Sequence, residues 1–205
     1  MIAVIDYGIG NLNSVVKAFN YIDIPVSLTD KPEVINKSDA LLLPGVGAFG
    51  EGMDNLKKKG LDKIIKKNIA EGKPFLGICL GLQLLFSCSE ENKGVEGLDL
   101  IKGSVQKFSL SDVPKIPHIG WNQVDFGKSD DPLFTGLTDN NNLYFVHSFF
   151  VEPEDEGVVL GKTTYGNKDF ASIIRKDNIW GIQCHPEKSS KVGLKILKNF
   201  GEVIN

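Results

Sequence analysis

The sequence predicts an α/β protein in which a mostly parallel, twisted sheet is flanked by helices and extended by antiparallel strands. Over residues 1–86, short apolar runs typical of buried strands alternate with segments of helical periodicity, as in a parallel sheet with helices on both faces. From about residue 98 to residue 182, shorter strand-like runs separated by proline, glycine and asparagine favour added antiparallel strands. A length of 205 residues without a linker or internal repeat indicates a single domain over residues 1–205.

The individual elements follow from apolar periodicity. Strands are expected at Ile2–Ile5 and at residues 26–28, 40–43 and 75–78, and helices at residues 12–22 and 51–70. Residues 178–184 read as a further strand, which Pro186 ends because proline cannot donate to a ladder. Ser189 and Ser190 then open a final helix that runs through residue 200 and is stopped by Gly201.

Charge and hydropathy exclude two classes of partner. The formal net charge of −3 argues against a nucleic-acid surface, so the lysine clusters at residues 57–59 and 66–67 are interpreted as solvated helix faces. The longest apolar stretch, residues 75–86, is too short to span a bilayer, and the first residues lack the features of a signal peptide. We therefore expect neither nucleic acid nor a membrane as partner.

The cysteines indicate the redox environment. Cys79, Cys88 and Cys184 are an odd number without metal-ligand spacing, which favours a reduced cytoplasm without disulfides. No metal or other cofactor is expected.

Cys79 stands where a strand turns into a helix. The segment 77–83 (GICLGLQ) places Gly77 and Gly81 two residues to each side of the cysteine, which is the thiol version of the G-x-S-x-G nucleophile elbow. The amides of a helix that begins at Leu80 favour a thiolate. The alternative interpretation is a small buried cysteine that only fills the core.

A base for this nucleophile is expected at the end of the last strand. His185 and Glu187 flank Pro186, and residues two apart in an extended chain face the same way. Glu187 would then accept from one ring nitrogen of His185 while the other faces the sulfur, as in a catalytic triad. The alternatives are a structural histidine and a residue that starts a helix. His118 and His147 lack the Pro-Glu context and are interpreted as structural or interface residues.

These two motifs together resemble the class I glutamine amidotransferases. Further segments at residues 6–11, 44–49, 117–122, 144–148 and 185–189 resemble the glutaminase subunits of imidazole glycerol phosphate synthases, and the match covers nearly the whole chain. The resemblance implies a flavodoxin-like fold and hydrolysis of L-glutamine to glutamate and ammonia. It also implies a heterodimer with a (β/α)₈-barrel cyclase subunit, which consumes the ammonia in histidine biosynthesis.

The glycine-rich segment after the third strand is interpreted as an oxyanion strand. It lacks the Lys-Ser/Thr ending of a phosphate loop, and attack on an amide needs backbone N–H groups aimed at the developing oxyanion. The N–H of Leu80 is one candidate. The resemblance implies that the N–H of Val46 is the second, after a peptide flip for which Gly45 and Gly47 provide freedom. Because a β-branched residue resists positive φ, the flip is expected to be disfavoured until a partner docks.

The resemblance also assigns binding positions. It implies that Gln83 and Glu91 hold the amino-acid end of the substrate, and that Ser148 and Phe149 contact it through backbone. It further places four residues at the contact with the cyclase or at the ammonia exit, namely Asn11, Trp121, Tyr144 and Lys188.

Three alternatives to the histidine-pathway subunit stay open at this point. A paralogous glutaminase could serve another barrel synthase, such as an enzyme that amidinates nucleotide sugars. A cysteine hydrolase of another class could use the same elbow. A non-catalytic scaffold would have no physical need to retain Cys79, His185 and Glu187 together.

Overall fold

The computed structural model describes residues 1–127, 130–138 and 141–204. The strands are β1 (Ile2–Ile5), β2 (Val26–Thr29), β3 (Ala40–Gly45), β4 (Phe75–Cys79), β5 (Cys88–Ser89), β6 (Gly103–Lys107), β7 (His118–Val124), β8 (Asn141–His147), β9 (Phe149–Pro153), β10 (Val159–Tyr165), β11 (Lys168–Lys176) and β12 (Ile179–Ile182). The helices are α1 (Leu12–Tyr21), α2 (Pro32–Lys37), α3 (Phe49–Lys58), α4 (Leu61–Ala70), α5 (Leu80–Gln83) and α6 (Ser190–Glu202), with 3₁₀ turns η1 (Pro132–Phe134), η2 (Glu156–Val158) and η3 (Pro186–Lys188).

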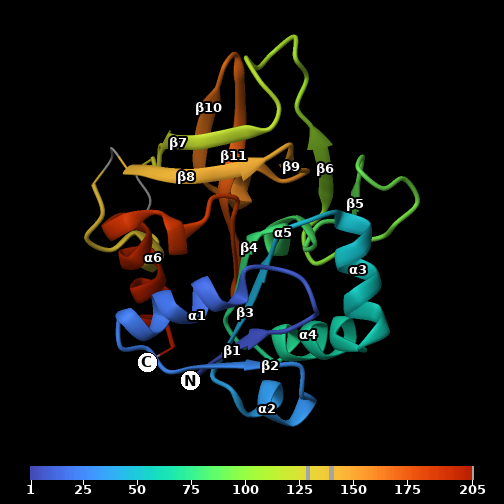
Figure 1. Ribbon diagram of the computed structural model, residues 1–205, viewed down its shortest axis with the longest axis vertical. Coiled ribbons are helices and arrows are strands. Elements are labelled where there is room, and N and C mark those ends of the chain that lie inside the picture. Colours follow the sequence, from blue (N-terminus) through green and yellow to red (C-terminus); the bar gives the residue numbers. More distant parts are fainter. Residues whose placement is uncertain (128–129, 139–140, 205) are drawn as a thin grey trace.

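Among the described residues, ten strands form one mixed sheet, and β7 and β8 form a separate antiparallel ribbon that runs across β10 and β11 (Figure 1). The sheet order is β2-β1-β3-β4-β12-β11-β9-β6-β5, with β10 paired to β11. The strands from β2 to β12 in this order are parallel, and β11, β9 and β6 continue the sheet antiparallel. The predicted α/β class, with a parallel centre and added antiparallel strands, is confirmed.

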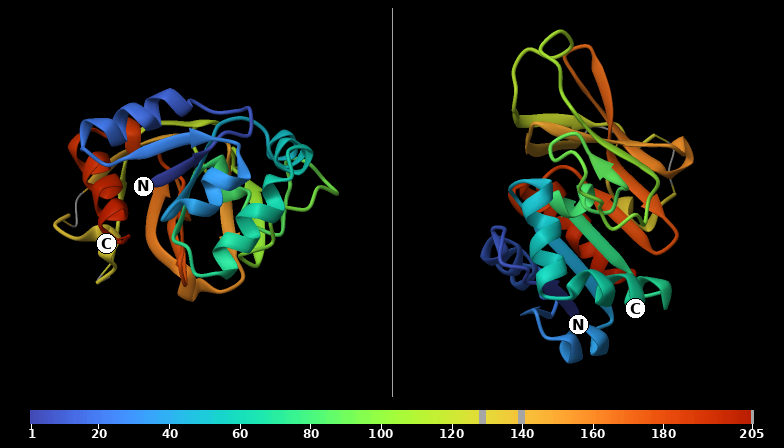
Figure 2. Two further views of the ribbon diagram at one scale, coloured as in Figure 1. Left: turned by 90° about the horizontal axis from the view of Figure 1, so that it is seen from below. Right: turned by 90° about the vertical axis from the view of Figure 1, so that its right-hand side faces the viewer.

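Alternation along the buried strands divides the interior into two cores. In β1, Ile2 and Val4 pack in one apolar cluster, whereas Ala3 and Ile5 pack in the other, because successive side chains point to opposite faces of a sheet. Helices α1 and α6 cover the first face, and α2, α3 and α4 cover the second (Figures 1 and 2). The expectation of helices on both faces is therefore met.

Two predicted helix bounds are wrong. The helix expected over residues 51–70 is two helices, α3 and α4, because Gly60 between them takes the left-handed conformation with φ +67°. Gly201 does not stop the last helix and lies within α6. A Cβ at Gly201 would lie 2.3 Å from Ile24 Cδ1, so this glycine permits close packing of α6 on the segment before β2.

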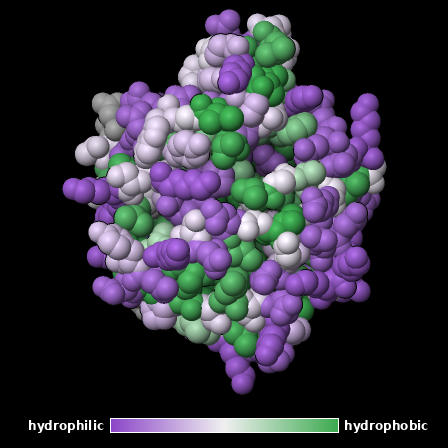
Figure 3. All heavy atoms as spheres, viewed as in Figure 1, coloured by the Kyte–Doolittle hydropathy of each residue, from purple (hydrophilic) through white to green (hydrophobic). Residues whose placement is uncertain are grey.

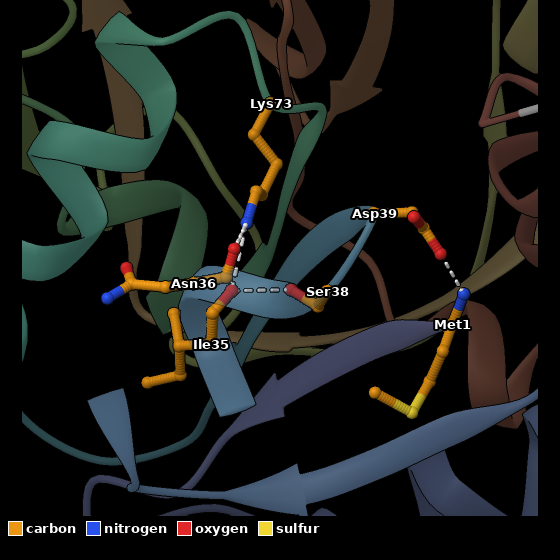
Figure 4. Close-up of polar contacts among 6 residues, drawn as sticks. All are labelled: Met1, Ile35, Asn36, Ser38, Asp39 and Lys73. Carbon is orange, nitrogen blue, oxygen red and sulfur yellow. Dashed lines mark hydrogen bonds and ion pairs between the residues drawn. The ribbon is translucent and has the colours of Figure 1, made fainter. Parts of the chain in front are cut away.

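Helix α2, which the sequence did not indicate, is closed at its C-terminus by a lysine from a distant loop (Figure 4). Lys73 Nζ donates to the carbonyl oxygens of Ile35 at 2.9 Å and Asn36 at 3.0 Å. These carbonyls lie in the last turn of α2, where that of Ile35 also accepts from the N–H and the hydroxyl of Ser38, and a cation there is favourable to the helix dipole. The amino group of Met1 pairs with Asp39, the residue before β3. Both contacts fix the entry of the strand that leads to the glycine-rich segment.

The surface agrees with the lysine-cluster interpretation. Residues 57–59 and 66–67 are exposed, and Figure 3 shows hydrophilic side chains gathered over α3. In the part of the chain that the structure describes, no helix combines the length and the apolar character needed to cross a membrane.

The fold brings three loops to one edge of the sheet. Strands β1, β3 and β4 are parallel neighbours, so the segments that follow them, at residues 6–11, at residues 46–48 and from Leu80 onward, leave the sheet at the same carboxyl edge. From β1 the chain adds β2 on one side and β3 and β4 on the other, so the strand order switches between β1 and β3. Ligands of doubly wound sheets bind at such a switch point. The candidate site is therefore expected at this edge.

Candidate active site

Cys79 lies on a sharp turn that only glycine neighbours permit. It ends β4 with φ +55° and ψ −108°, and α5 begins at the next residue. A Cβ on Gly81 would lie 1.8 Å from the carbonyl oxygen of Leu43, and one on Gly77 would lie 2.6 Å from that of Gly81. The structure thus places Cys79 at the predicted elbow. Helix α5 ends at Gln83 after four residues, so its contribution is the free amides of its first turn.

His185 and Glu187 form a buried pair beyond the end of β12. The Nδ1 of His185 and the Oε1 of Glu187 are 2.8 Å apart, and the side chains are only 3% and 2% exposed. The residues share a side because Pro186–Lys188 is a 3₁₀ turn, so the predicted extended chain is wrong although the predicted pairing is present. Glu187 Oε2 has no hydrogen-bond partner among the described residues, so Glu187 interacts through its other oxygen with His185.

Backbone contacts hold this turn against the β7–β8 ribbon. The N–H of His185 donates to the carbonyl oxygen of Tyr144 at 2.8 Å. Ser189 accepts from the N–H of Tyr144 at 2.9 Å and donates its hydroxyl to the carbonyl oxygen of His185 at 2.6 Å. Ser189, expected to open the last helix, makes no capping bond and instead fixes the His185 loop.

The environment of His185 favours its charged form. Burial by itself lowers the pKa of His185, but the Cys79 sulfur and the Glu187 carboxylate act in the opposite direction and raise it to about 10. Nε2, the ring nitrogen not held by Glu187, is buried and makes no hydrogen bond of ordinary geometry with a described residue. At neutral pH the imidazolium therefore has an N–H available for proton transfer.

The glycine-rich segment lies directly beside the nucleophile. Gly45 is the register partner of Cys79 in the β3–β4 pair. Val46 follows, 39% exposed and with a negative φ, and Gly47 takes φ +116°. A Cβ on Gly45 would lie 2.0 Å from the Tyr7 hydroxyl, which explains why glycine is required there.

Tyr7 is a buried group that the sequence reasoning did not single out. Its hydroxyl is fully buried and has no hydrogen-bond partner among the described residues. Burial, with contributions from Cys79 and Glu51, holds the pKa of Tyr7 far above its usual range. The side chain is therefore a neutral phenol beneath the glycine-rich segment.

A pocket of about 460 Å³ joins the predicted groups. It is lined by Val46, Gly47, Cys79, Leu80, Gln83, Glu91, Pro117, Val146, His147, Ser148, Phe149 and Lys188. The nucleophile, the oxyanion candidates Val46 and Leu80, and all four predicted substrate-binding residues thus share one cavity. Its size suits an amino-acid substrate.

Glu91 is held at the pocket by a helix N-terminus. Its Oε2 accepts from the N–H of Phe49 at 2.7 Å, and Asn92 Oδ1 accepts from the N–H of Gly50 at 2.8 Å. Both bonds satisfy free amides at the start of α3, where a carboxylate is favourable to the helix dipole. The carboxylate is therefore preorganised beside the pocket rather than free on a helix surface.

The turn between β8 and β9 forms another wall. The carbonyl oxygen of Phe149 accepts from Gln83 Nε2 at 3.1 Å and is 2.8 Å from His147 Nδ1. The carbonyl oxygen of Ser148 accepts from the N–H of Phe108 at 3.1 Å. Each of these two carbonyls therefore already has a hydrogen-bond partner within the protein.

Three of the four predicted interface residues lie together on the ribbon side. Trp121 pairs with Tyr144 across β7 and β8, with ring centroids 6.1 Å apart, and Lys188 Nζ lies 5.9 Å above the Tyr144 ring. Ile119, which the sequence reasoning missed, is exposed beside Trp121, both to 54%. Asn11 is also exposed but lies at the start of α1 on the carboxyl edge of the sheet.

The most consequential missed residue is Gln183. It is fully buried, and its Nε2 lies 3.7 Å from the Cys79 sulfur. The only sequence signal was a polar residue within the apolar run of residues 179–184. Across the described residues, no group of three or more His, Cys, Asp and Glu side chains is arranged to hold a metal ion.

Comparison with known proteins yields one consistent family. The profile of the family described as "Glutamine amidotransferase class-I" matches residues 3–203. The chain is 50% identical to "Imidazole glycerol phosphate synthase subunit HisH" of Moorella thermoacetica over 99% of this chain and 95% of that protein. It is also 50% identical to the protein of the same name from Methanocaldococcus jannaschii over the full length of both. A solved structure described as a glutamine amidotransferase shares the fold, with a TM-score of 0.77 at 18% identity over 99% of this chain and 98% of that one.

Proposed function

We propose that this chain, which belongs to the class I glutamine amidotransferase family, is the glutaminase subunit of an imidazole glycerol phosphate synthase. It hydrolyses L-glutamine to glutamate and ammonia and passes the ammonia to a cyclase subunit. One observation carries the chemical part of the proposal: Cys79 lines an amino-acid-sized pocket, and His185, held by a buried carboxylate, is close enough to Cys79 for the sulfur to raise its pKa.

The first half-reaction forms a thioester. The sulfur of Cys79 attacks the side-chain carboxamide carbon of glutamine, and the carbonyl electrons move to oxygen. His185 gives its Nε2 proton to the departing nitrogen, the electron pair returns from oxygen to re-form the carbonyl, and the C–N bond breaks so that ammonia leaves. Glu187 accepts from Nδ1–H at 2.8 Å, which fixes the ring orientation and stabilises the imidazolium.

The second half-reaction releases glutamate. His185, now neutral, takes a proton from water, and the hydroxide attacks the thioester carbon. The S–C bond breaks, which restores the sulfur anion beside the imidazolium. Gln83 and Glu91 hold the amino-acid end of the substrate throughout, because both line the pocket and both are fixed by bonds within the protein.

The proposed oxyanion site is expected to make the activity depend on a partner. The N–H groups of Leu80 and Val46 stabilise the developing oxyanion. Val46 keeps a negative φ in this structure, and turning its amide toward the oxyanion requires the segment between Gly45 and Gly47 to change conformation. A cyclase docked over the exposed side chains of Val46, Ile119 and Trp121 favours this change in the conformation of the glycine-rich segment.

The test is a glutaminase assay of the chain with its co-purified cyclase subunit. The Cys79→Ser variant is expected to bind the cyclase normally and to lose glutamine hydrolysis, because a hydroxyl is nearly isosteric but far less nucleophilic. Cys88→Ser is the matched control, since Cys88 is exposed and does not line the pocket. Hydrolysis by Cys79→Ser at the wild-type rate would overturn the proposal.

A further inference from the structure

We propose that the side-chain amide of Gln183 holds the Cys79 sulfur and stabilises its thiolate by donating an N–H···S hydrogen bond. The inference rests on the proposed role of Cys79 as the nucleophile. Gln183 belongs neither to the proposed triad nor to the oxyanion strand, and it is not one of the proposed substrate-binding residues.

The register of the central strands places the two residues together. Strand β12 runs parallel to β4 with Ile182 opposite Ile78, so Gln183 and Cys79 are the next residues on neighbouring strands. The side chain of Gln183 is fully buried, and its Nε2 is 3.7 Å from the sulfur, within reach of an N–H···S bond. A buried amide needs partners, and the sulfur is one of them.

The orientation of the Gln183 amide follows from its neighbours. The carbonyl oxygen of Phe149 can only accept, so the Gln83 atom 3.1 Å from it must be the nitrogen. The same nitrogen lies 3.1 Å from Gln183, whose facing atom must therefore be the oxygen. The NH₂ group of Gln183 is consequently the end that faces Cys79.

A buried chain of hydrogen bonds fixes the Phe149 end of this arrangement. Asn122 Nδ2 lies 3.3 Å from His118 Nε2, His118 Nδ1 lies 3.0 Å from His147 Nε2, and His147 Nδ1 lies 2.8 Å from the Phe149 oxygen. Burial lowers the pKa values of His118 and His147 to about 4 and about 3, so both rings are neutral. Because the Phe149 oxygen accepts, His147 must carry its proton on Nδ1, and its Nε2 then accepts from His118. His118 therefore also carries its proton on Nδ1, and every hydrogen bond in the series donates toward Phe149.

The hydrogen bond from the Gln183 amide stabilises the sulfur most when the sulfur is a charged thiolate. Hydrogen bonds to an ionised acceptor are about twice as strong as neutral ones, so the amide favours the thiolate over the thiol and over the thioester. The titratable groups that act on the same sulfur from other directions are His185 and Cys184 after β12 and Tyr7 after β1. Glu187 acts through His185, and Glu51 of α3 acts on Tyr7.

The test measures the pH dependence of Cys79 alkylation by iodoacetamide in the full-length chain. A Cys88→Ser background removes the exposed thiol, and mass spectrometry of the Cys79 peptide gives the rate. Gln183→Met keeps the volume and removes the donor, and Gln183→Asn keeps an amide that is one methylene too short. We expect the midpoint of the rate profile to rise by about one pH unit in Gln183→Met, which is about a ten-fold lower rate below both midpoints. Gln183→Asn is expected to lie between wild type and Gln183→Met.

Asn68→Leu is the matched control. It removes a buried amide from α4 that bonds to Asn36 and Ile64, far from the sulfur, so it should change stability without moving the midpoint. If Gln183→Met and Gln183→Asn leave the midpoint unchanged while wild-type Cys79 reacts as a thiolate, the role of Gln183 is refuted. If wild-type Cys79 shows no thiolate reactivity at any pH from 6 to 9, the proposed nucleophile itself fails.

Discussion

Glu187→Gln is expected to lower the pKa of His185, and Cys79→Ala in the same chain is expected to bring it below the ordinary value of a histidine. The carboxylate and the ring are 2.8 Å apart and almost entirely buried, so water screens their attraction little. The sulfur acts on the same ring. Removing either partner removes a negative charge that favours the imidazolium.

The other histidines of the protein supply the magnitude. His118 and His147 are also buried but have no carboxylate partner, and burial lowers their pKa values to about 4 and about 3. His185, equally enclosed, has a pKa of about 10 because Cys79 and Glu187 outweigh burial. A neighbouring opposite charge changes a pKa by about 1–3 pH units, so Glu187→Gln should lower the His185 value by that amount.

The assay is an NMR titration of the histidine ring protons from pH 4 to pH 10. The chain has three histidines, so each signal can be assigned with one substitution. In the wild type, two rings should remain neutral above pH 5 and the third should remain charged beyond pH 8. In the double variant, all three should be neutral at pH 7. A His185 signal that titrates near pH 6.5 and ignores both substitutions would refute the reasoning.

Three further outcomes are expected. Val46→Gly should raise the basal kcat of the free subunit about 5- to 30-fold, since it removes a left-handed cost of about 1–2 kcal/mol; an unchanged basal rate in a steady-state assay would place the conformational control elsewhere. Gly81→Ala should abolish hydrolysis and cost about 3 kcal/mol in denaturant unfolding, because its Cβ meets the Leu43 carbonyl. Gly52→Ala should be tolerated, because its Cβ meets only the ends of the Leu84 and Leu80 side chains; equal behaviour of the two would contradict the elbow. Tyr7→Phe should increase the free energy of unfolding by about 1 kcal/mol, because it removes an unpaired buried hydroxyl, and a loss of stability would reveal an unseen partner.

The sequence was sufficient where local chemistry determines structure. The glycines around Cys79 predict the elbow because any Cβ there would meet backbone. The Pro-Glu context of His185 predicts the pairing, although a 3₁₀ turn and not an extended chain produces it. Both features depend on residues within a few positions of each other.

The remaining part of the site depends on contacts between distant segments. Gln183 meets Gln83 and Cys79, which lie 100 and 104 positions away in the chain, and only the β4–β12 pairing brings them together. The same holds for Glu91, which binds the start of α3 from 42 positions away. Periodicity identifies strands, but it does not specify which strands become neighbours or which buried amides then face one another.

The register of the β7–β8 ribbon determines both its exposed apolar surface and the side chains that it directs inward. Along β7, Ile119 and Trp121 face outward, while His118 and Asn122 face inward to the chain of hydrogen bonds that ends at Phe149. Because side chains alternate with a period of two, a slip of one residue would bury the apolar surface and expose both polar groups. The pairing of His118 with His147 therefore fixes the exposed apolar surface and the pocket wall together. If the proposed cyclase docks on this surface and shifts the ribbon, it also acts on the Phe149 carbonyl that orients Gln83, and through Gln83 on Gln183 and the sulfur.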